Sequence, residues 1–137
     1  MTPKEFLQQA YFIDRRIKLD MEKLSAARAK LFGKGVNYIS DGTKAERHGN
    51  GVENAYIRVL AYEEKIDAEI DELTRKREEI EQVIEKLPDK TERELLSRRY
   101  LLFQKWDKIA EDMGYSERHV LRIHGTALKK MSLNVTF

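Results

Sequence analysis

The chain has 137 residues, of which 41% are hydrophobic and 36% are charged, with a formal net charge of +2 at pH 7. This charged fraction exceeds the roughly 25% that is usual in globular proteins, which favours long helices with solvated faces. The absence of cysteine excludes disulfides and cysteine-ligated zinc, and no apolar run approaches the roughly 20 residues of a membrane span. We therefore expect a soluble, cytoplasmic protein with no membrane partner.

A long amphipathic helix is predicted from the N-terminus to about residue 32. Thr2, Pro3 and Glu5 form its start, with a cap, a proline at the first helical position and a glutamate that closes a capping box. Asp20 takes one position of an apolar stripe whose other members recur mostly at steps of three and four: Phe6, Ala10, Ile13, Ile17, Leu24, Ala27 and Leu31. This helix therefore has one apolar face to bury.

Residues 33–51 are predicted to form a long mobile loop, because they contain five glycines and no strong periodicity. A loop of this length is either functional or disordered. The glycines do not form a phosphate-binding loop, since the Gly-x-x-x-x-Gly-Lys-Ser/Thr pattern is absent and no strand precedes them. We expect the loop to act as a flexible tether.

A second long helix is predicted from about residue 52 to residue 87, with a heptad pattern. One seam position falls at Val59, Ile66, Leu73, Ile80 and Leu87, and the other at Tyr56, Glu63, Ile70, Arg77 and Ile84. The two charged seam residues weaken a simple parallel zipper, because unpaired charges in a seam are costly. The pattern favours a long antiparallel helical hairpin with the first helix, a coiled-coil-like stalk over residues 1–88 that joins a second copy as a homodimer.

Three short helices are predicted over residues 89–131, followed by a tail over residues 132–137. Thr91 and Glu94 form a capping box for the first of them, which runs to about residue 102. Its apolar side chains are expected to cover the next two helices, with Trp106 in the core. The fold class is therefore all-α, a helical hairpin followed by a three-helix head.

The last two helices are predicted to be joined by a tight turn. Gly114 follows the apolar stripe of the first, where a helix C-terminus favours a residue that tolerates positive φ. Ser116 occupies the N-cap position of the second, and the acidic Glu117 follows it at the positive end of the helix dipole. One face of the second helix is apolar, with Val120, Ile123, Ala127, Leu128 and Met131. The other is largely basic, with Arg118, His119, Arg122, Lys129 and Lys130.

A tight turn before a basic helix is typical of a helix-turn-helix whose recognition helix enters the major groove of double-stranded DNA. The alternative is a corner between two helices that binds no nucleic acid. Residues 91–137 carry nine Lys and Arg against six Asp and Glu, a modest excess. One such domain should bind DNA weakly and in a salt-dependent way, so a second copy or a polymerase partner is expected to raise the affinity.

The same residues resemble known families. The runs WDKIAEDM and SERHVLRIHGTALKKM are similar to the two helices of region four of primary sigma factors, which reads the promoter −35 element. A closer resemblance is to small phage and prophage proteins of Gram-positive bacteria related to ArpU-type late transcriptional regulators. It is carried by Arg99-Tyr100, Trp106, Ile109-Ala110, Gly114 to Ser116, Arg118 to Val120, Arg122 to Gly125 and Ala127-Leu128. The resemblance covers the last third of the chain and implies a transcription regulator of phage or prophage origin, with RNA polymerase as a further partner.

Carried over position by position, the sigma resemblance and the position in the motif assign six side chains to DNA: Ser116, Glu117, Arg118, His119, Arg122 and Lys105. Arg118 or Arg122 can pair with guanine O6 and N7, and Ser116 or Lys105 can anchor a phosphate. Glu117 stands where sigma factors commonly have arginine, and Leu121 replaces another basic residue. The DNA sequence that is read therefore need not be the −35 hexamer.

No catalytic, metal or cofactor site is predicted, and we expect a protein that is not an enzyme. The stretch from His119 to Arg122 matches the His-x-x-Arg element of tyrosine recombinases, but no tyrosine follows Tyr115 to act as the nucleophile. His119 and His124 are five residues apart, off a common helical face, which disfavours a metal site.

Two rival functions stay open. One is a protein-only adaptor that binds RNA polymerase or another partner, which salt-independent binding without DNA affinity would favour. The other is a phage DNA-packaging component similar to a small terminase subunit, which a ring-forming stoichiometry would favour.

Overall fold

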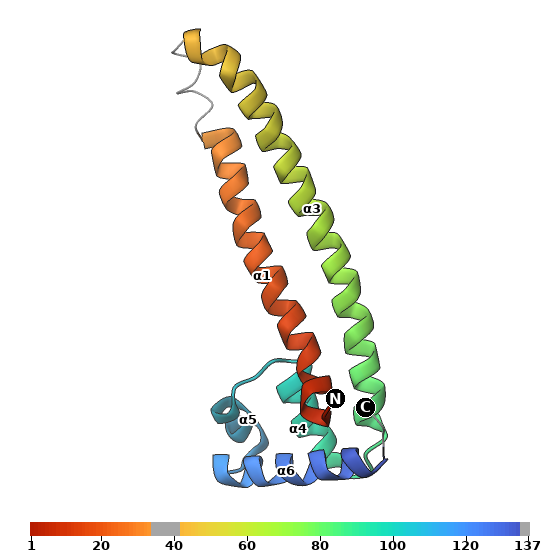
Figure 1. The fold of residues 1–137 in the computed structure, drawn as a ribbon. Helices are drawn as coiled ribbons and strands as arrows, with labels where there is room; N and C mark the ends of the chain where they lie inside the picture. The colour runs from red at the N-terminus through yellow and green to blue at the C-terminus, as the bar shows by residue number, and fades with distance from the viewer. Residues whose placement is uncertain (34–41, 135–137) are drawn as a thin grey trace. The chain divides into compact units, whose positions relative to one another are not determined.

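The structure, a computed structural model, describes residues 1–33 and 42–134. The regular secondary structure of these residues is entirely helical, so the prediction of an all-α protein is confirmed (Figure 1). The helices are α1 (Pro3–Gly33), α3 (Gly42–Glu85), α4 (Lys90–Tyr100), α5 (Trp106–Met113) and α6 (Glu117–Asn134). Over the part of the chain that the structure describes, none of them has the length and apolar character needed to cross a membrane.

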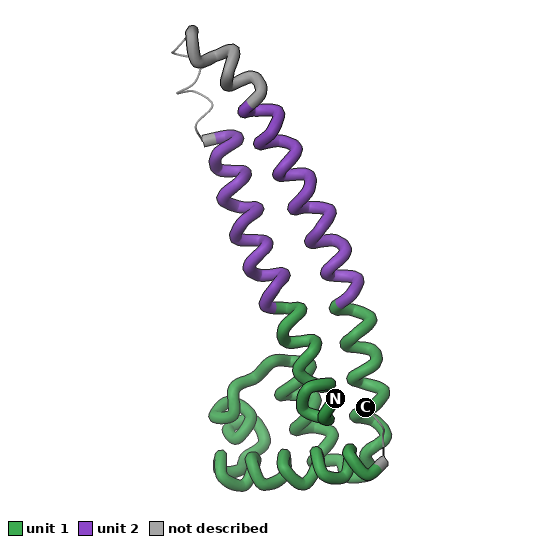
Figure 2. The backbone as a smooth tube through the Cα atoms, in the orientation of Figure 1, with its two compact units in different colours: residues 1–14, 73–137 green, residues 15–72 purple. Residues whose placement is uncertain are grey.

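The chain divides into two compact units (Figure 2). Unit 1 comprises residues 1–14 and 73–137, and unit 2 comprises residues 15–72. The first turns of α1 and the last turns of α3 belong to the unit that holds the three short helices. The reason is packing, since Leu7 of α1 and Ile80 of α3 lie fully buried in the core of unit 1.

The core of unit 1 draws on all the helices described. Its buried members are Leu7, Ala10, Ile80, Ile84, Leu87, Leu95, Leu96, Tyr100, Ile109, Ala110, Val120, Ala127 and Met131. Helices α4, α5 and α6 pack against one another, and this core fixes α6 by its apolar face. The opposite face of α6 is left to solvent.

The starts of α1 and α4 follow the capping rules, with one difference from the prediction. The Glu5 N–H donates to Thr2 Oγ1 at 3.1 Å and the Thr2 N–H donates to Glu5 Oε2 at 3.0 Å, so the capping box of α1 is confirmed. The N-cap of α4 is Asp89, whose Oδ1 accepts from the N–H groups of Thr91 at 2.8 Å and Glu92 at 3.1 Å. The prediction of Thr91 as the cap was wrong, because the carboxylate two residues earlier satisfies both donors.

The start of α3 also differs from the prediction. Residues 33–51 were expected to form a loop, but α3 begins at Gly42. The added segment contains Lys, Ala, Glu and Arg, which extend a helix readily once it is nucleated. Residues 34–41, the rest of the predicted loop, lie outside the described residues.

Unit 2 pairs residues 15–32 of α1 with residues 51–72 of α3 in antiparallel directions (Figure 2). The predicted stripe of α1 is buried here, with Ile17, Asp20, Leu24 and Ala27 all inside. On α3 the predicted second seam is wrong at two places, since Tyr56 is 54% exposed and Ile70 is 45% exposed. Beside Ile70, Glu69 is only 5% exposed. Glu69 takes the inner position because it meets Arg16 and Asp20 of α1.

Candidate nucleic-acid interface

The turn between α5 and α6 has the two features that the sequence predicts. Gly114 has φ 73°, a left-handed conformation that an L side chain rarely adopts, and it ends α5. The N–H of Tyr115 then donates to the carbonyl oxygen of Ala110 at 3.0 Å. Ser116 Oγ accepts from the N–H of His119 at 3.1 Å and so caps α6. The turn therefore sets the direction of α6 through local hydrogen bonds.

The start of α5 has no side-chain cap. Lys105 occupies the N-cap position without a capping hydrogen bond, and Phe103 just before it has φ 57°. The Phe103 ring lies edge-on to Tyr11, with centroids 5.8 Å apart, and the Arg77 guanidinium lies 5.7 Å from its centroid. Aromatic and cation–π contacts therefore pack Phe103 in the loop before α5, although they satisfy no backbone N–H group of the helix.

An aromatic cluster holds the inner face of α6. The Tyr100 hydroxyl and His124 Nε2 are 2.6 Å apart, and the His124 ring centroid lies 4.7 Å from that of Trp106. Burial lowers the pKa of His124 to about 4 and raises the pKa of Tyr100 to about 12. At neutral pH the hydroxyl therefore donates to a neutral imidazole. Trp106, expected in the core, is half-buried at its edge, with the Arg99 guanidinium 4.5 Å from its ring centroid.

The outer face of α6 carries most of the side chains assigned to DNA. Ser116, Glu117, Arg118 and Arg122 are exposed, and His119 is half-buried with its ring edge-on to Tyr115 at 4.7 Å. These five therefore lie on the first two turns of one helix or at its cap. The sixth, Lys105, is exposed at the start of α5, where it lines a hollow of about 210 Å³ that Tyr11 and Phe12 also line.

The cations of unit 1 fall into two groups. Arg98 pairs with Glu94 at 2.8 Å and with Asp112 at 3.3 Å, and Lys130 pairs with the buried Glu92 at 2.8 Å. Lys108 likewise pairs with Asp112 at 3.1 Å, and Arg99 donates to the carbonyl oxygen of Gln104 at 2.9 Å. By contrast, no ion pair among the described residues involves Arg118, Arg122 or Lys129. The uncommitted positive charge of α6 is thus gathered on its outer face.

Two further residues of this face were not assigned from the sequence. Leu121 is 48% exposed, and Gly125, one turn later, is exposed as well. Leu121 lies three residues after Arg118, and Gly125 lies four residues after Leu121. The helical periodicity alone could therefore have placed both on the face of Arg118. Because a leucine and a glycine carry no charge, residue type gave no signal of an interface.

Unit 2 contains a buried carboxyl pair. Asp20 is 1% exposed and hydrogen-bonds Glu69, while Arg16 Nε lies 2.6 Å from Glu69 Oε2 and Lys65 Nζ lies 3.3 Å from Asp20 Oδ2. The hydrogen bond from Glu69 lowers the pKa of Asp20, and burial raises the pKa of Glu69. No group of three or more His, Asp or Glu side chains suited to a metal ion occurs in residues 1–33 and 42–134.

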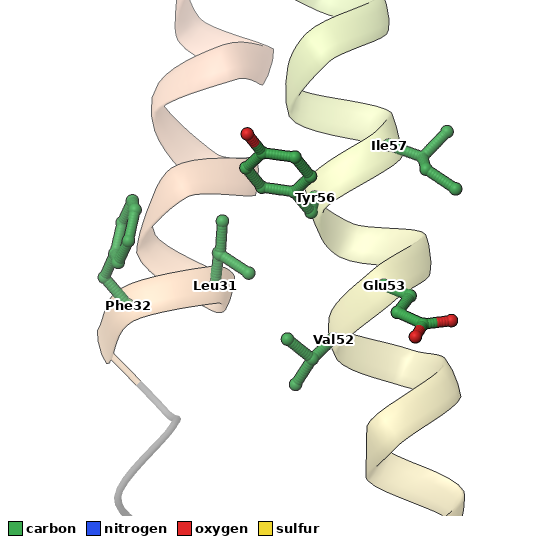
Figure 3. Close-up of a pocket in the computed structure, with 6 residues that line it drawn as sticks. All are labelled: Leu31, Phe32, Val52, Glu53, Tyr56 and Ile57. Atoms are coloured by element: carbon green, nitrogen blue, oxygen red, sulfur yellow. The ribbon is translucent and has the colours of Figure 1, made fainter.

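An apolar hollow of about 590 Å³ lies in unit 2, lined by Leu31 and Phe32 of α1 and by Val52, Glu53, Tyr56 and Ile57 of α3. Leu31 and Tyr56 project into the space between the two helices (Figure 3). Phe32 is 74% exposed and Tyr56 54% exposed.

The helices and the surface of α6 define an all-α protein that ends in two helices joined by a tight turn. The chain belongs to the family of proteins of unknown function DUF1492, whose family model matches residues 37–132. The matched stretch contains all of α3, α4 and α5, and α6 as far as residue 132. No curated protein and no solved structure was found to match the chain.

Proposed function

We propose that this protein is a sequence-specific DNA-binding transcription regulator of phage or prophage origin, which uses α5 and α6 as a helix-turn-helix to read promoter or operator DNA. One observation carries the proposal: Arg118 and Arg122 stand exposed on the first two turns of α6, without an ion pair among the described residues. Recognition helices present base-reading side chains from this part of the helix. The other cations of α4 and α5 are largely held by carboxylates or carbonyls, so they compete less for phosphate.

The spacing of the two arginines suits neighbouring base pairs. Four helical residues rise by about 6 Å, so both guanidinium groups can reach the floor of one major groove. Each can donate two hydrogen bonds to O6 and N7 of a guanine. Glu117 beside them can accept from a cytosine amino group, which adds selectivity against other bases. His119, set against Tyr115, offers a further donor to a base or a phosphate.

The start of α6 supplies phosphate contacts. The first N–H groups of a helix and its dipole favour an anion at the N-terminus, and Ser116 lies exposed there. Lys105 adds an exposed cation at the start of α5. These groups position α6 on the duplex without selecting a sequence.

We further propose that unit 2 forms an antiparallel hairpin stalk through which two copies pair. The exposed Phe32 and Tyr56 beside the apolar hollow support this proposal, because a second copy would cover them. Two DNA-binding heads on one dimer would compensate for the modest charge of each. Light scattering should show a dimer for the wild type and a monomer for Tyr56→Glu. A monomeric wild type at high concentration would remove the dimer, although not the hairpin.

The same hollow supports one alternative, a protein-only adaptor that binds RNA polymerase or another protein. In that case binding to polymerase would be insensitive to salt and would not need DNA. Selection of bound DNA with and without RNA polymerase separates the two functions. The proposed regulator recovers, in at least one arm, a DNA motif that depends on Arg118 and Arg122, whereas the adaptor recovers no such motif.

The double variant Arg118→Ala/Arg122→Ala tests the DNA-reading role. Loss of two bidentate contacts is expected to cost at least about 2 kcal/mol, or roughly 30-fold in affinity for the preferred sequence, and to remove the preference. Helicity and melting should be unchanged, since both side chains are exposed. The matched control is Lys30→Ala/Arg58→Ala, which removes the same charge from exposed positions of unit 2. Retained specificity in the first variant, or an equal loss in the control, would sink the assignment.

A further inference from the structure

Gly125 occupies a position in α6 where the protein itself does not need a glycine. Its backbone is helical, its surface is exposed, and a Cβ built on it meets no atom within 4 Å. Glycine weakens a helix relative to alanine, because it loses more backbone entropy on folding. The chain therefore carries a destabilising residue that none of its described contacts explains.

The side chains around Gly125 indicate the charge of a molecule that could bind in the open space beside its backbone. On one face of a helix its neighbours are the residues three, four and seven positions away, which here include Leu121, Arg122, Arg118 and Lys129. Three of these are exposed cations that make no ion pair with a described residue. A bare stretch of backbone between Arg122 and Lys129 fits a polyanion that approaches closely.

The distance along α6 identifies the part of the DNA that this would be. Gly125 lies seven residues after Arg118, which corresponds to about 10 Å along the helix. The major groove is about 12 Å wide and about 8.5 Å deep. When Arg118 is at the base edges, Gly125 is therefore near the rim of the groove, where a sugar–phosphate strand passes.

We propose that Gly125 is the point at which a DNA sugar–phosphate backbone crosses α6, held there by Lys129 one turn further on. This inference rests on the proposed function and deepens it, because it identifies a close-approach site outside the six side chains assigned from the sequence. The absence of a side chain at Gly125 lets the strand lie against the helix backbone. A methyl group there would hold the strand away and lengthen the Lys129 contact.

Gly125→Ala in the full chain tests the proposal through two readouts that should move in opposite directions. Because alanine strengthens a helix and has room here, the melting temperature should rise by about 2 to 5 °C. Affinity for the selected DNA sequence should nevertheless fall about tenfold. The matched control is Gly51→Ala, at an exposed helical glycine of unit 2 whose Cβ also meets no atom within 4 Å. There the affinity should stay unchanged.

Two further measurements assign the lost affinity to the DNA strand. Lys129→Ala should lower the slope of log affinity against log salt by about one, and in the Gly125→Ala background it should have a smaller effect. A duplex with neutral methylphosphonate linkages at the crossing point should bind the wild type more weakly and should remove the effect of Lys129→Ala. Unchanged DNA affinity of Gly125→Ala, or an effect of Lys129→Ala that persists on the neutral linkages, would overturn the proposal. A wild-type protein that binds no DNA would overturn the proposed function itself.

Discussion

Unit 1 and unit 2 are both helical, but they bury their surfaces in different ways (Figure 2). Unit 1 closes a continuous apolar core with residues from all the described helices and leaves a charged face of α6 outside. Unit 2 buries a single seam that contains Asp20 and Glu69, and it leaves Phe32 and Tyr56 exposed. Both units leave some large apolar side chains exposed, such as Phe12 and Leu102 in unit 1. The difference therefore lies in what the units bury, which is a continuous apolar core in unit 1 and a seam with two carboxyl groups in unit 2.

The largest difference between the units is expected in the unfolding free energy that each loses when a buried leucine is replaced by alanine. Leu95→Ala in the fully buried core of unit 1 is expected to cost about 2–5 kcal/mol of unfolding free energy, because the surrounding helices cannot collapse into the cavity. Leu24→Ala in the seam of unit 2 should cost about 2 kcal/mol or less, since two helices can close more of the gap. Urea unfolding followed by circular dichroism measures both. Trp106, the only tryptophan, reports unit 1 alone by fluorescence. Equal costs would contradict the difference between the units.

The next effect is a pH dependence specific to unit 1. His124 has a folded-state pKa of about 4, below its ordinary value of 6.5. Between these two pH values the imidazole is protonated in the unfolded chain but neutral in the folded chain. Stability from this group is complete above pH 6.5 and is lost as the pH falls towards 4. The unfolding free energy should drop by about 2 kcal/mol between pH 7 and pH 5.

Unfolding followed by Trp106 fluorescence at the two pH values measures this drop, with His124→Gln as the control that lacks the titrating ring. The control is less stable at pH 7, since it loses the fitted contact with Tyr100, but its stability should change much less with pH. A wild-type curve no steeper than that of the control would show that His124 titrates normally.

A smaller effect is expected at the carboxyl pair of unit 2. Asp20→Ala leaves Glu69 buried beside Arg16 without its hydrogen-bond partner, which should cost about 1–3 kcal/mol. Asp20→Leu/Glu69→Leu replaces the whole pair by apolar side chains and should be near neutral or stabilising, because both desolvation costs disappear. Circular dichroism melts of the single and double variants test this order. A double variant weaker than Asp20→Ala would mean that the pair contributes net stability.

The parts of the fold that depend on neighbouring residues could be predicted from the sequence. The capping box of Thr2 and Glu5, the left-handed Gly114 and the cap at Ser116 all rest on contacts within five residues. The start of α3 could not be located, because a glycine-rich segment reads as a loop while helix propagation from its flank extends through it. The burial of Glu69 in place of Ile70 could not be predicted from α3 alone, because it depends on the ion pair with Arg16 of α1.

The candidate interface was predictable to a similar degree. The helical period placed Arg118 and Arg122 on one face from residue spacing alone. Which cations stay uncommitted depends on partners distant in sequence, as with Lys130 and Glu92, and only the folded chain brings these together. Gly125 became informative once the space around it was known.

The most direct test of the central claim is selection of bound sequences from random duplex DNA by the intact protein at a fixed salt concentration near physiological. The account predicts enrichment of one motif that contains a guanine for at least one arginine. That motif should be lost with Arg118→Ala/Arg122→Ala and retained with Lys30→Ala/Arg58→Ala. Recovery of no motif, both for the protein alone and with RNA polymerase present, would contradict the claim that α6 reads DNA.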